Sequence, residues 1–435
     1  MTATFDFDRL LSDVLETEGP QGAAPTAVVE SALRQARVVR QRRPIVAMLD
    51  RRAWPASRLS LGNPGTTRVV MVALVMLLIL ALIATAIGVG SRLLRRDDGL
   101  PPHWSVAGPL AEARTVFTAT LLPDGKVLVA GGGASESSGW IASAELFDPA
   151  TGSWSGTRPM IEGRRFHTAT VLTNGKVLVT GGYGPGGNLA SAELYDPVAG
   201  TWTAAASMSD VRGQHVAVRL PDGKVLVAGG TGGSSPSKVA ELYDPGTDTW
   251  TSVGTMVDWR ASPTATLLRD GRVLVAGGFG NGVEITSAEL YDPSTRSWIA
   301  TGSLTENRVD GASATLLPDG RVLVAGGSHP SAEIYDPATG TWTAARGLVT
   351  GQGGQTATLM PDGRVLIAGG VDTNQAALAM TQFYDPGPGT WTAGPPTVEA
   401  RYSGMAVSLG DGRILVMGGS GSTNAALRSA ELYGD

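Results

Sequence analysis

The 435 residues include no cysteine, and charged residues make up only 17% of the chain. Without cysteine the protein has no disulfide bond, thiolate nucleophile, cysteine-ligated zinc or iron–sulfur cluster. Glycine and proline are abundant, because 59 Gly and 26 Pro exceed what most globular chains carry. They are still fewer than in collagen or low-complexity sequence. The composition therefore limits the chemistry and leaves the compartment open.

Positive charge is also scarce in the larger part of the chain. Residues 97–435 hold 21 basic and 32 acidic side chains, a net charge of −11, whereas the whole chain carries −5. Phosphate contacts need a basic face. We therefore expect no nucleic-acid partner.

One long apolar run divides the chain. Residues 69–91 are 23 uncharged residues, mostly Val, Leu, Ile, Ala and Met, bracketed by Arg68 and Arg92. A helix of this length crosses a hydrocarbon core of about 30 Å, so we predict a transmembrane helix over 69–91. Arginines near the span are slightly more numerous on its N-terminal side. This bias predicts a single-pass cell-membrane protein with a cytoplasmic N-terminus and an extracytoplasmic C-terminal part.

The segment before the span, residues 1–68, has two stretches with apolar residues at helical spacing, 5–18 and 25–43. They predict two short amphipathic helices with too small a core for a robust domain. The layout resembles the cytosolic stubs of bacterial membrane-anchored anti-sigma-like proteins. Two interpretations stay open, a solvated tether and a docking element for a cytoplasmic regulator, which would make the protein a signalling receptor. Residues 92–102 are then a linker.

From residue 104 onward the sequence repeats a unit of about 48 residues, the length of a propeller blade. Seven Gly-Gly pairs begin at Gly131, Gly181, Gly229, Gly277, Gly326, Gly369 and Gly418. The repeated tryptophans are Trp104, Trp154, Trp202, Trp250, Trp298, Trp342 and Trp391. Each unit predicts four strands, "TATLL", "KVLVAGG", "SAELYDP" and one that starts at Trp. We therefore predict an all-β fold, a seven-bladed β-propeller over residues 103–435.

The ends of the repeat region predict how the ring closes. The chain enters with the single Trp104 strand, runs through six full units and finishes with only three strands over 405–433. We expect the Trp104 strand to complete the last blade, which removes open sheet edges without a covalent bond. An alanine six residues before each turn glycine predicts that the first strand of each blade lines a crowded channel.

These features resemble the kelch repeat family: Gly-Gly pairs, Tyr-Asp-Pro as in Tyr195–Pro197, and the repeated Trp. The resemblance covers residues 103–435 and implies a β-propeller that binds other molecules. Phe147 replaces the tyrosine in one unit, and the terminal Tyr433 lacks the following Pro.

One face of the propeller is the better candidate for binding. Turns between strands 1 and 2 and between strands 3 and 4 are uniform, whereas the 2–3 and 4–1 connections vary. Function tends to reside on variable loops carried by a rigid scaffold. We therefore place any binding site on the side of the 2–3 and 4–1 connections.

An arginine recurs in the 4–1 connections, two residues after an acid, and both are lost together at Thr350 and Gln352. The six arginines are Arg114, Arg164, Arg212, Arg260, Arg308 and Arg401. Their joint loss favours acid–arginine pairs that stitch blades together. The alternative is an arginine ring at the channel mouth that binds an anionic partner, since the guanidinium fork suits carboxylates. The kelch resemblance implies the second role, because related propellers contact acidic peptides through arginines at this motif position.

His167 and His215 occupy one repeat position in adjacent blades, so we include them as candidate ligand contacts without assigning a metal. The Glu of "AEL" recurs in six units, which favours a structural role over catalysis. The main hypothesis is a non-enzymatic module for a protein or carbohydrate ligand, with no cofactor. The alternative enzyme resembles the galactose-oxidase-like copper radical oxidases, whose cofactor needs a Tyr cross-linked to Cys that this chain cannot form.

Overall fold

The computed structural model describes residues 102–435, except residues 234, 310, 328, 346–352 and 435. The described residues belong to one compact unit, Gly99–Asp435. The predicted N-terminal segment (1–68), transmembrane helix (69–91) and most of the linker (92–102) lie outside the described residues and stay predictions. Within the described residues, no helix is long and apolar enough to span a membrane.

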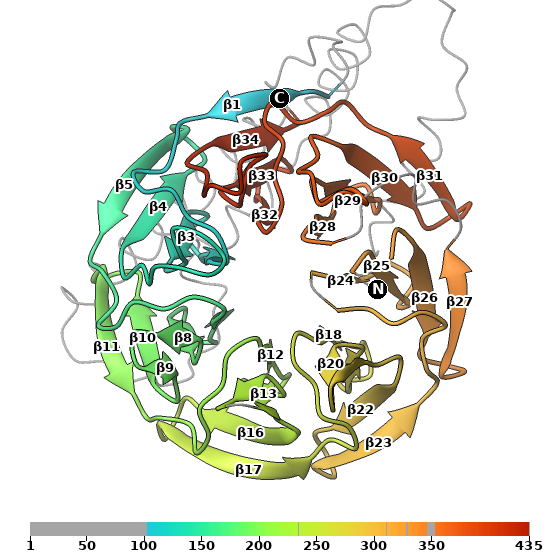
Figure 1. Ribbon diagram of the computed structural model, residues 1–435. Helices are drawn as coiled ribbons and strands as arrows, with labels where there is room; N and C mark the ends of the chain where they lie inside the picture. Colours follow the sequence, from blue (N-terminus) through green and yellow to red (C-terminus); the bar gives the residue numbers. More distant parts are fainter. Residues whose placement is uncertain (1–101, 234, 310, 328, 346–352, 435) are drawn as a thin grey trace, which may run out of the picture. The chain divides into compact units, whose positions relative to one another are not determined.

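Seven four-stranded antiparallel sheets are arranged as blades in a closed ring (Figure 1). Blades 1 to 3 contain β2 (Thr118–Leu121), β3 (Val127–Ala130), β4 (Ala144–Asp148) and β5 (Ser153–Thr157); β6 (Thr168–Val171), β7 (Val177–Thr180), β10 (Ala192–Asp196) and β11 (Thr201–Ala205); and β12 (Val216–Arg219), β13 (Val225–Ala228), β16 (Val239–Asp244) and β17 (Thr249–Thr255).

Blades 4 to 6 follow the same order from the inner to the outer strand. They contain β18 (Thr264–Leu267), β19 (Val273–Ala276), β22 (Ala288–Asp292) and β23 (Ser297–Thr301); β24 (Ser313–Leu316), β25 (Val322–Ala325), β26 (Ala332–Asp336) and β27 (Thr341–Ala345); and β28 (Thr356–Leu359), β29 (Val365–Ala368), β30 (Thr381–Asp385) and β31 (Thr390–Ala393). The seven-bladed propeller predicted from the repeats is therefore confirmed.

Blade 7 closes the ring with strands from both ends of the repeat region. It contains β32 (Met405–Ser408), β33 (Ile414–Met417), β34 (Ala430–Tyr433) and, as the outer strand, β1 (Trp104–Ala107). Trp104 pairs with Tyr433 in register, and their rings lie 5.2 Å apart. The indole Nε1 of Trp104 donates to the carbonyl of Pro395 in blade 6 at 3.0 Å. The predicted closure by the Trp104 strand is confirmed.

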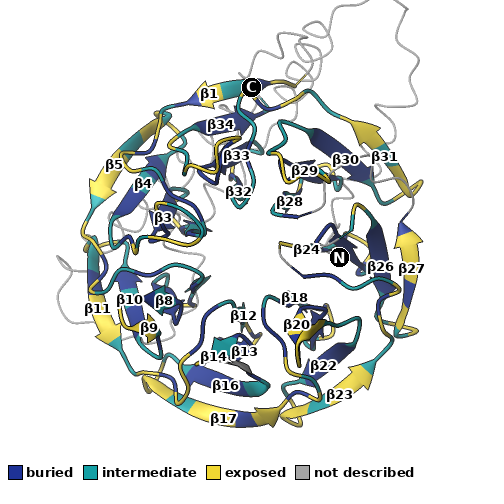
Figure 2. Ribbon diagram, viewed as in Figure 1, coloured by how far each residue is buried: buried dark blue, intermediate teal, exposed yellow. Residues whose placement is uncertain are grey.

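The core lies between the blades. The second strand of every blade is buried throughout, whereas most residues of the outer strands are exposed (Figure 2). Seven apolar clusters each combine two neighbouring blades, as where Leu128 and Ala144 of blade 1 meet Val177 and Tyr195 of blade 2. Each buried Val, Leu, Ile, Phe or Met side chain in these clusters contributes about 1.5–3 kcal/mol. A blade is therefore stable only between two others.

The Gly-Gly pair that follows each second strand packs closely against the backbone of two 4–1 connections. In blade 1, Gly131 and Gly132 have φ of +67° and +107°. A Cβ on Gly131 would lie 2.6 Å from the carbonyl oxygen of Arg164 in the next blade. A Cβ on Gly132 would lie 2.7 Å from the carbonyl oxygen of Thr115. Only glycine permits both the positive φ and these approaches, so the pair joins neighbouring blades.

Candidate binding site at the mouth of the channel

The 2–3 and 4–1 connections lie on one face of the propeller, as expected from the sequence; we call it the loop face. Residues of the two kinds of connection pair directly, for example Thr115 with Gly133 and Arg165 with Tyr183. Three short hairpins extend the 2–3 connections: β8 (Tyr183–Gly184) with β9 (Gly187–Asn188), β14 (Thr231–Gly232) with β15 (Ser235–Pro236), and β20 (Phe279–Gly280) with β21 (Val283–Glu284).

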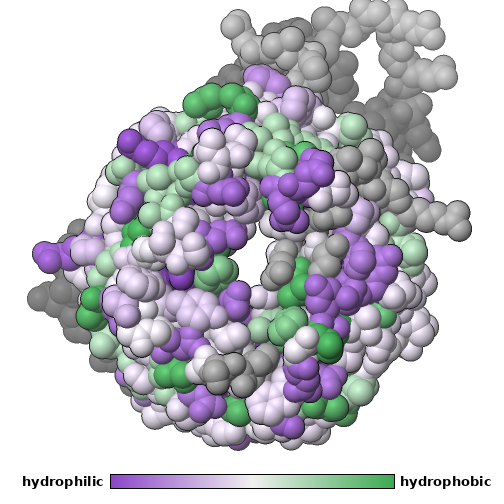
Figure 3. Space-filling view, in the orientation of Figure 1, coloured by the Kyte–Doolittle hydropathy of each residue, from purple (hydrophilic) through white to green (hydrophobic). Residues whose placement is uncertain are grey.

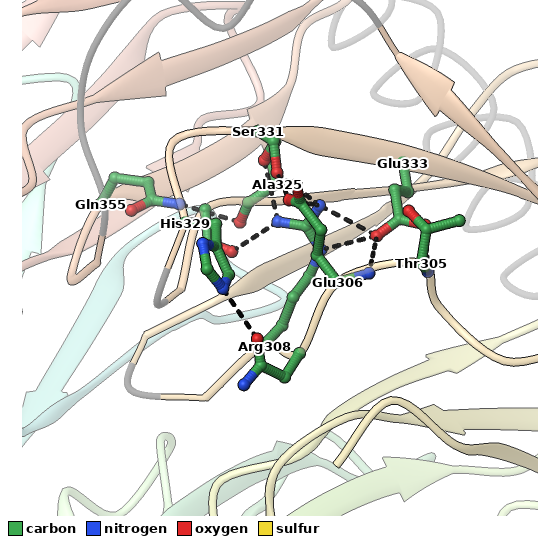
Figure 4. A network of polar contacts seen from close by, with 10 residues as sticks. Thr305, Glu306, Arg308, Ala325, His329, Ser331, Glu333 and Gln355 are labelled. Carbon is green, nitrogen blue, oxygen red and sulfur yellow. Dashed lines mark hydrogen bonds and ion pairs between the residues drawn. The ribbon is translucent and has the colours of Figure 1, made fainter. Parts of the chain in front are cut away.

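The recurrent arginines lie inside their own blades. Arg114 is fully buried: Nη1 donates to the carbonyls of Gly131 (2.8 Å) and Ser143 (3.1 Å), and Nη2 to Oε1 of Glu145 (2.7 Å). The same arrangement surrounds Arg308, Ser331 and Glu333 in blade 5 (Figure 4). The other pairs are Arg164–Glu193, Arg212–Glu241, Arg260–Glu289 and Arg401–Glu431. The Glu of "AEL" is thus a structural ion-pair partner.

For five of the six arginines, all but Arg401, the acid two residues earlier is a more distant partner. Glu112 lies 4.0 Å from Arg114 and Glu306 lies 3.6 Å from Arg308, and both acids are largely exposed. The predicted acid–arginine pairing therefore exists, but the principal carboxylate comes from the third strand. Burial lowers the pKa of Arg114 and Arg212, and the paired carboxylates oppose that shift.

The arginine residues also join blades, through their backbone. The Gly132 amide of blade 1 donates to the Arg164 carbonyl of blade 2 at 2.8 Å, and the Gly419 amide of blade 7 donates to the Arg114 carbonyl at 2.9 Å. All six side chains are at most 1% exposed. They are not presented at the mouth as the anion-binding ring considered above. Their geometry provides a structural role, which holds the loop face in place.

His167 and His215 line the channel mouth, and both side chains are buried between neighbouring blades. Nε2 of His167 bonds to the Thr118 hydroxyl of blade 1 at 3.0 Å, and Nε2 of His215 bonds to the Thr168 hydroxyl of blade 2 at 2.9 Å. Gln355 has the same repeat position and donates to the Ala325 carbonyl of blade 5 at 2.8 Å (Figure 4). These side chains therefore connect neighbouring blades.

Both histidines are neutral at physiological pH. Burial lowers the pKa of His167 to about 3, and the charge of Arg164 adds to this shift. Burial also lowers the pKa of His215 well below its usual value, with the charge of Arg212 acting in the same direction. Their position favours packing over a charged contact with a ligand.

A ring of residues with left-handed backbone surrounds the mouth, and the sequence analysis missed it. One residue per blade, nine before the turn glycine, has positive φ; we call these seven the mouth ring. They are Val116 (49°), Phe166 (53°), Gln214 (55°), Ser262 (49°), Gly311 (86°), Gly354 (69°) and Ser403 (51°). The fixed offset from the turn glycine was the available signal, but the residue types differ too much to reveal it.

Backbone hydrogen bonds link successive members of the mouth ring. The amide of Phe166 donates to the Val116 carbonyl (3.2 Å), that of Gln214 to Phe166 (3.0 Å), and that of Ser262 to Gln214 (2.9 Å). The Ser403 amide likewise donates to the Gly354 carbonyl at 2.8 Å. A non-glycine residue in this conformation costs about 1–3 kcal/mol and persists only where surrounding structure enforces it. The inter-blade bonds and the neighbouring Gly-Gly pairs provide that enforcement.

The mouth ring borders a cavity of about 910 Å³ at the end of the channel. The opening at the centre of the ring of blades is visible in Figure 3. Among the described residues that line the cavity, Glu136 is the only charged one at physiological pH. The rest are the neutral imidazoles of His167 and His215, glycines, and apolar, amide or hydroxyl side chains such as Phe166, Gln214 and Ser262. This volume and mixture suit a small ligand or a protruding part of a larger one.

One solved structure with a similar fold is that of a copper-containing enzyme. The propeller resembles a structure described as a novel fungal alcohol oxidase with catalytic diversity in the AA5 family, in complex with copper. The TM-score is 0.65 at 20% identity, over 77% of this chain and 76% of that one, so the likeness concerns the fold alone.

The residues of this chain do not fit such a copper centre. No cysteine is present, and the described residues contain no group of three or more His, Asp or Glu side chains able to hold a metal ion. Nε2 of both His167 and His215 already bonds to a threonine hydroxyl. Although the fold is similar to that of an oxidase, the described residues of this chain do not include a set of copper ligands.

The sequence comparisons agree with the repeats. No curated protein matches the chain. The family model described as "Kelch motif" matches residues 164–209, 212–257 and 260–305, which correspond to three successive units in blades 2 to 4. Together with the seven sheets of the structure, this match identifies kelch motif repeats within a seven-bladed β-propeller.

Proposed function

We propose that the propeller is a non-enzymatic interaction module that binds a protein or glycan in the cavity at the mouth of the channel. The observation that carries this proposal is the mouth ring, in which five non-glycine residues keep a strained backbone beside the cavity. Such strain gathers at ligand-binding and active sites. The buried arginine–glutamate pairs and Gly-Gly contacts supply the rigid support that a binding site on loops requires.

The binding test compares one variant in the cavity with one on the opposite face. Ala312 lines the cavity, so Ala312→Trp should fill it, whereas Val198, in the 3–4 turn of blade 2, is 98% exposed. The full-length chain in detergent is applied to arrays of glycans and peptides. We expect Ala312→Trp to lose the probes that the parent protein and Val198→Trp retain. Equal binding by all three proteins would overturn the proposal.

We also propose that residues 69–91 anchor the chain in the cell membrane with the propeller outside. The support is the uncharged 23-residue run and the surplus of arginine before it. Protease added to intact cells should then release fragments of 103–435 and spare 1–68. Digestion of residues 1–68 alone would show that the chain has the opposite orientation in the membrane and would contradict this proposal.

A further inference from the structure

The charge at the channel mouth argues against an anionic ligand. All six recurrent arginines are at most 1% exposed and are neutralised inside their blades. Arg165, next to Phe166, is not among the residues that line the cavity, and its Nη1 donates to the carbonyl oxygen of Glu136 at 2.8 Å. The Glu136 side chain itself adds negative charge to the cavity lining. A carboxylate, sulfate or phosphate in the cavity would therefore lose water and meet a like charge.

The backbone around the mouth offers little to an extended peptide. Peptides commonly bind by adding a strand to a free sheet edge. Here four mouth-ring amides already donate to the carbonyl of the mouth-ring residue in the preceding blade; they belong to Phe166, Gln214, Ser262 and Ser403. These four amides are therefore not available to an added strand, so we expect recognition to use side chains.

Those side chains combine an aromatic face with neutral hydrogen-bonding groups. Phe166 is half-buried and meets Tyr183 edge-on, with ring centroids 5.6 Å apart at 89°. The Tyr183 hydroxyl donates to Oε1 of Gln214 at 3.1 Å, which fixes the amide of Gln214 beside the cavity. Hydroxyls of Ser262 and Ser403 follow in the same ring. Side chains that are already held by such contacts lose little conformational entropy when a ligand binds.

We infer that the channel mouth binds an uncharged saccharide; this inference rests on the proposed binding function. The hydroxyls of a sugar both donate and accept, so they match a lining of amides and hydroxyls. The C–H face of a pyranose has the partial positive charge that the face of an aromatic ring such as Phe166 attracts. The cavity of about 910 Å³ lies within the usual range of small-ligand pockets.

The experiment titrates the full-length chain with matched neutral and anionic sugars. The neutral probes are gluco-, manno- and galacto-oligosaccharides; the anionic probes are oligogalacturonides and sialylated and sulfated counterparts; an acidic peptide completes the set. We expect at least one neutral probe to bind in calorimetry and to outcompete its charged counterpart. Phe166→Ala and Gln214→Ala should each weaken it about tenfold, as loss of an aromatic contact or a hydrogen bond does.

Controls separate failure of the inference from failure of the proposed function. Val198→Ala, on the opposite face of the blade that carries Phe166, should leave affinity unchanged. Thermal unfolding of each variant shows whether a loss of binding reflects a loss of fold, and Gln214→Ala provides a second variant if Phe166→Ala unfolds. Anionic sugars or acidic peptide that bind, and are blocked by Ala312→Trp, would overturn the saccharide inference and leave the binding function intact. If no probe depends on the mouth, both fail.

Discussion

Nη2 of Arg164 lies 2.7 Å from Oε1 of Glu193, and the two side chains are 0% and 3% exposed. The same carboxylate accepts the backbone amides of Ile161 (2.7 Å) and Glu162 (3.1 Å) from the 4–1 connection. One buried ion pair thus fixes the loop that leads to the channel mouth. Its counterpart in blade 6 is absent from the sequence, where Gln352 and Gln382 replace the arginine and the glutamate.

Removing both partners of this pair should cost less than the sum of the two single removals. Arg164→Gln leaves Glu193 buried without its cation, so we expect a loss of about 3–5 kcal/mol in unfolding free energy. Arg164→Gln combined with Glu193→Gln should cost clearly less than the sum of the single variants, because no uncompensated charge remains. Urea unfolding of the two single variants and the double variant measures this coupling. Additive losses would contradict the assigned role.

Alanine at the first glycine of the Gly-Gly pair should be strongly destabilising. In Gly131→Ala the new Cβ would meet the Arg164 carbonyl oxygen and the His167 ring at 2.6 Å, with φ at +67°. We expect a loss of more than about 2 kcal/mol. Gly156→Ala is the matched control, since its Cβ would meet nothing within 4 Å. That control should be neutral or gain up to about 1 kcal/mol. Thermal midpoints that fall equally would refute the inter-blade role of Gly131.

His167 should make stability fall as the pH falls. Its pKa is about 3 in the folded protein, and the ordinary pKa of a histidine is 6.5, so between these values the unfolded chain binds more protons. The contribution is complete above pH 6.5 and declines toward pH 3, with a slope of up to about 1.4 kcal/mol per pH unit. Urea midpoints from pH 7.5 to 4.5 measure it.

His167→Gln should remove this part of the pH dependence. Glutamine already occupies the same repeat position as Gln355, where its amide bonds to the preceding blade. The exposed His103→Gln is the control. An unchanged pH slope in His167→Gln would show that the buried ring does not titrate as described.

Closure by the first strand predicts a cost for truncating Trp104. This side chain is 7% exposed, packs on Tyr433 and donates to the Pro395 carbonyl. Trp104→Ala should lose about 3–5 kcal/mol, as is usual for a buried tryptophan. Trp140, which is 44% exposed, gives the control variant Trp140→Ala with a small effect. Limited proteolysis should cleave near residue 405 first in Trp104→Ala, and an unchanged cleavage pattern would contradict closure at this strand.

Much of the fold could be predicted because its signals are local. Each unit carries its own Gly-Gly pair, Trp and turn glycine, so counting these residues yields the seven blades. The incomplete last unit and the single Trp104 strand required each other, and they pair through Trp104 and Tyr433. The shared side of the 2–3 and 4–1 connections followed from the alternating direction of strands in a meander.

The orientation of the recurrent arginine side chains could not be predicted from the sequence. The joint loss of acid and arginine indicated that they interact, yet the partner that matters most is Glu145 or its equivalent on the third strand. Sequence spacing cannot tell whether a guanidinium points into the blade or toward the channel. The direction depends on the carbonyls of Gly131 and Ser143, which come together only when the second and third strands pair.

The sequence by itself determined the repeat, the number of blades and the strand that closes them, because periodic apolar residues and turn glycines act within one unit. Only the tertiary structure decided what faces the channel mouth. Val116, Phe166, Gln214, Ser262 and Ser403 have no residue type common to all of them, and their common left-handed backbone is enforced by bonds between blades. Contacts between units have no signature inside one unit, so the fold must form before the site exists.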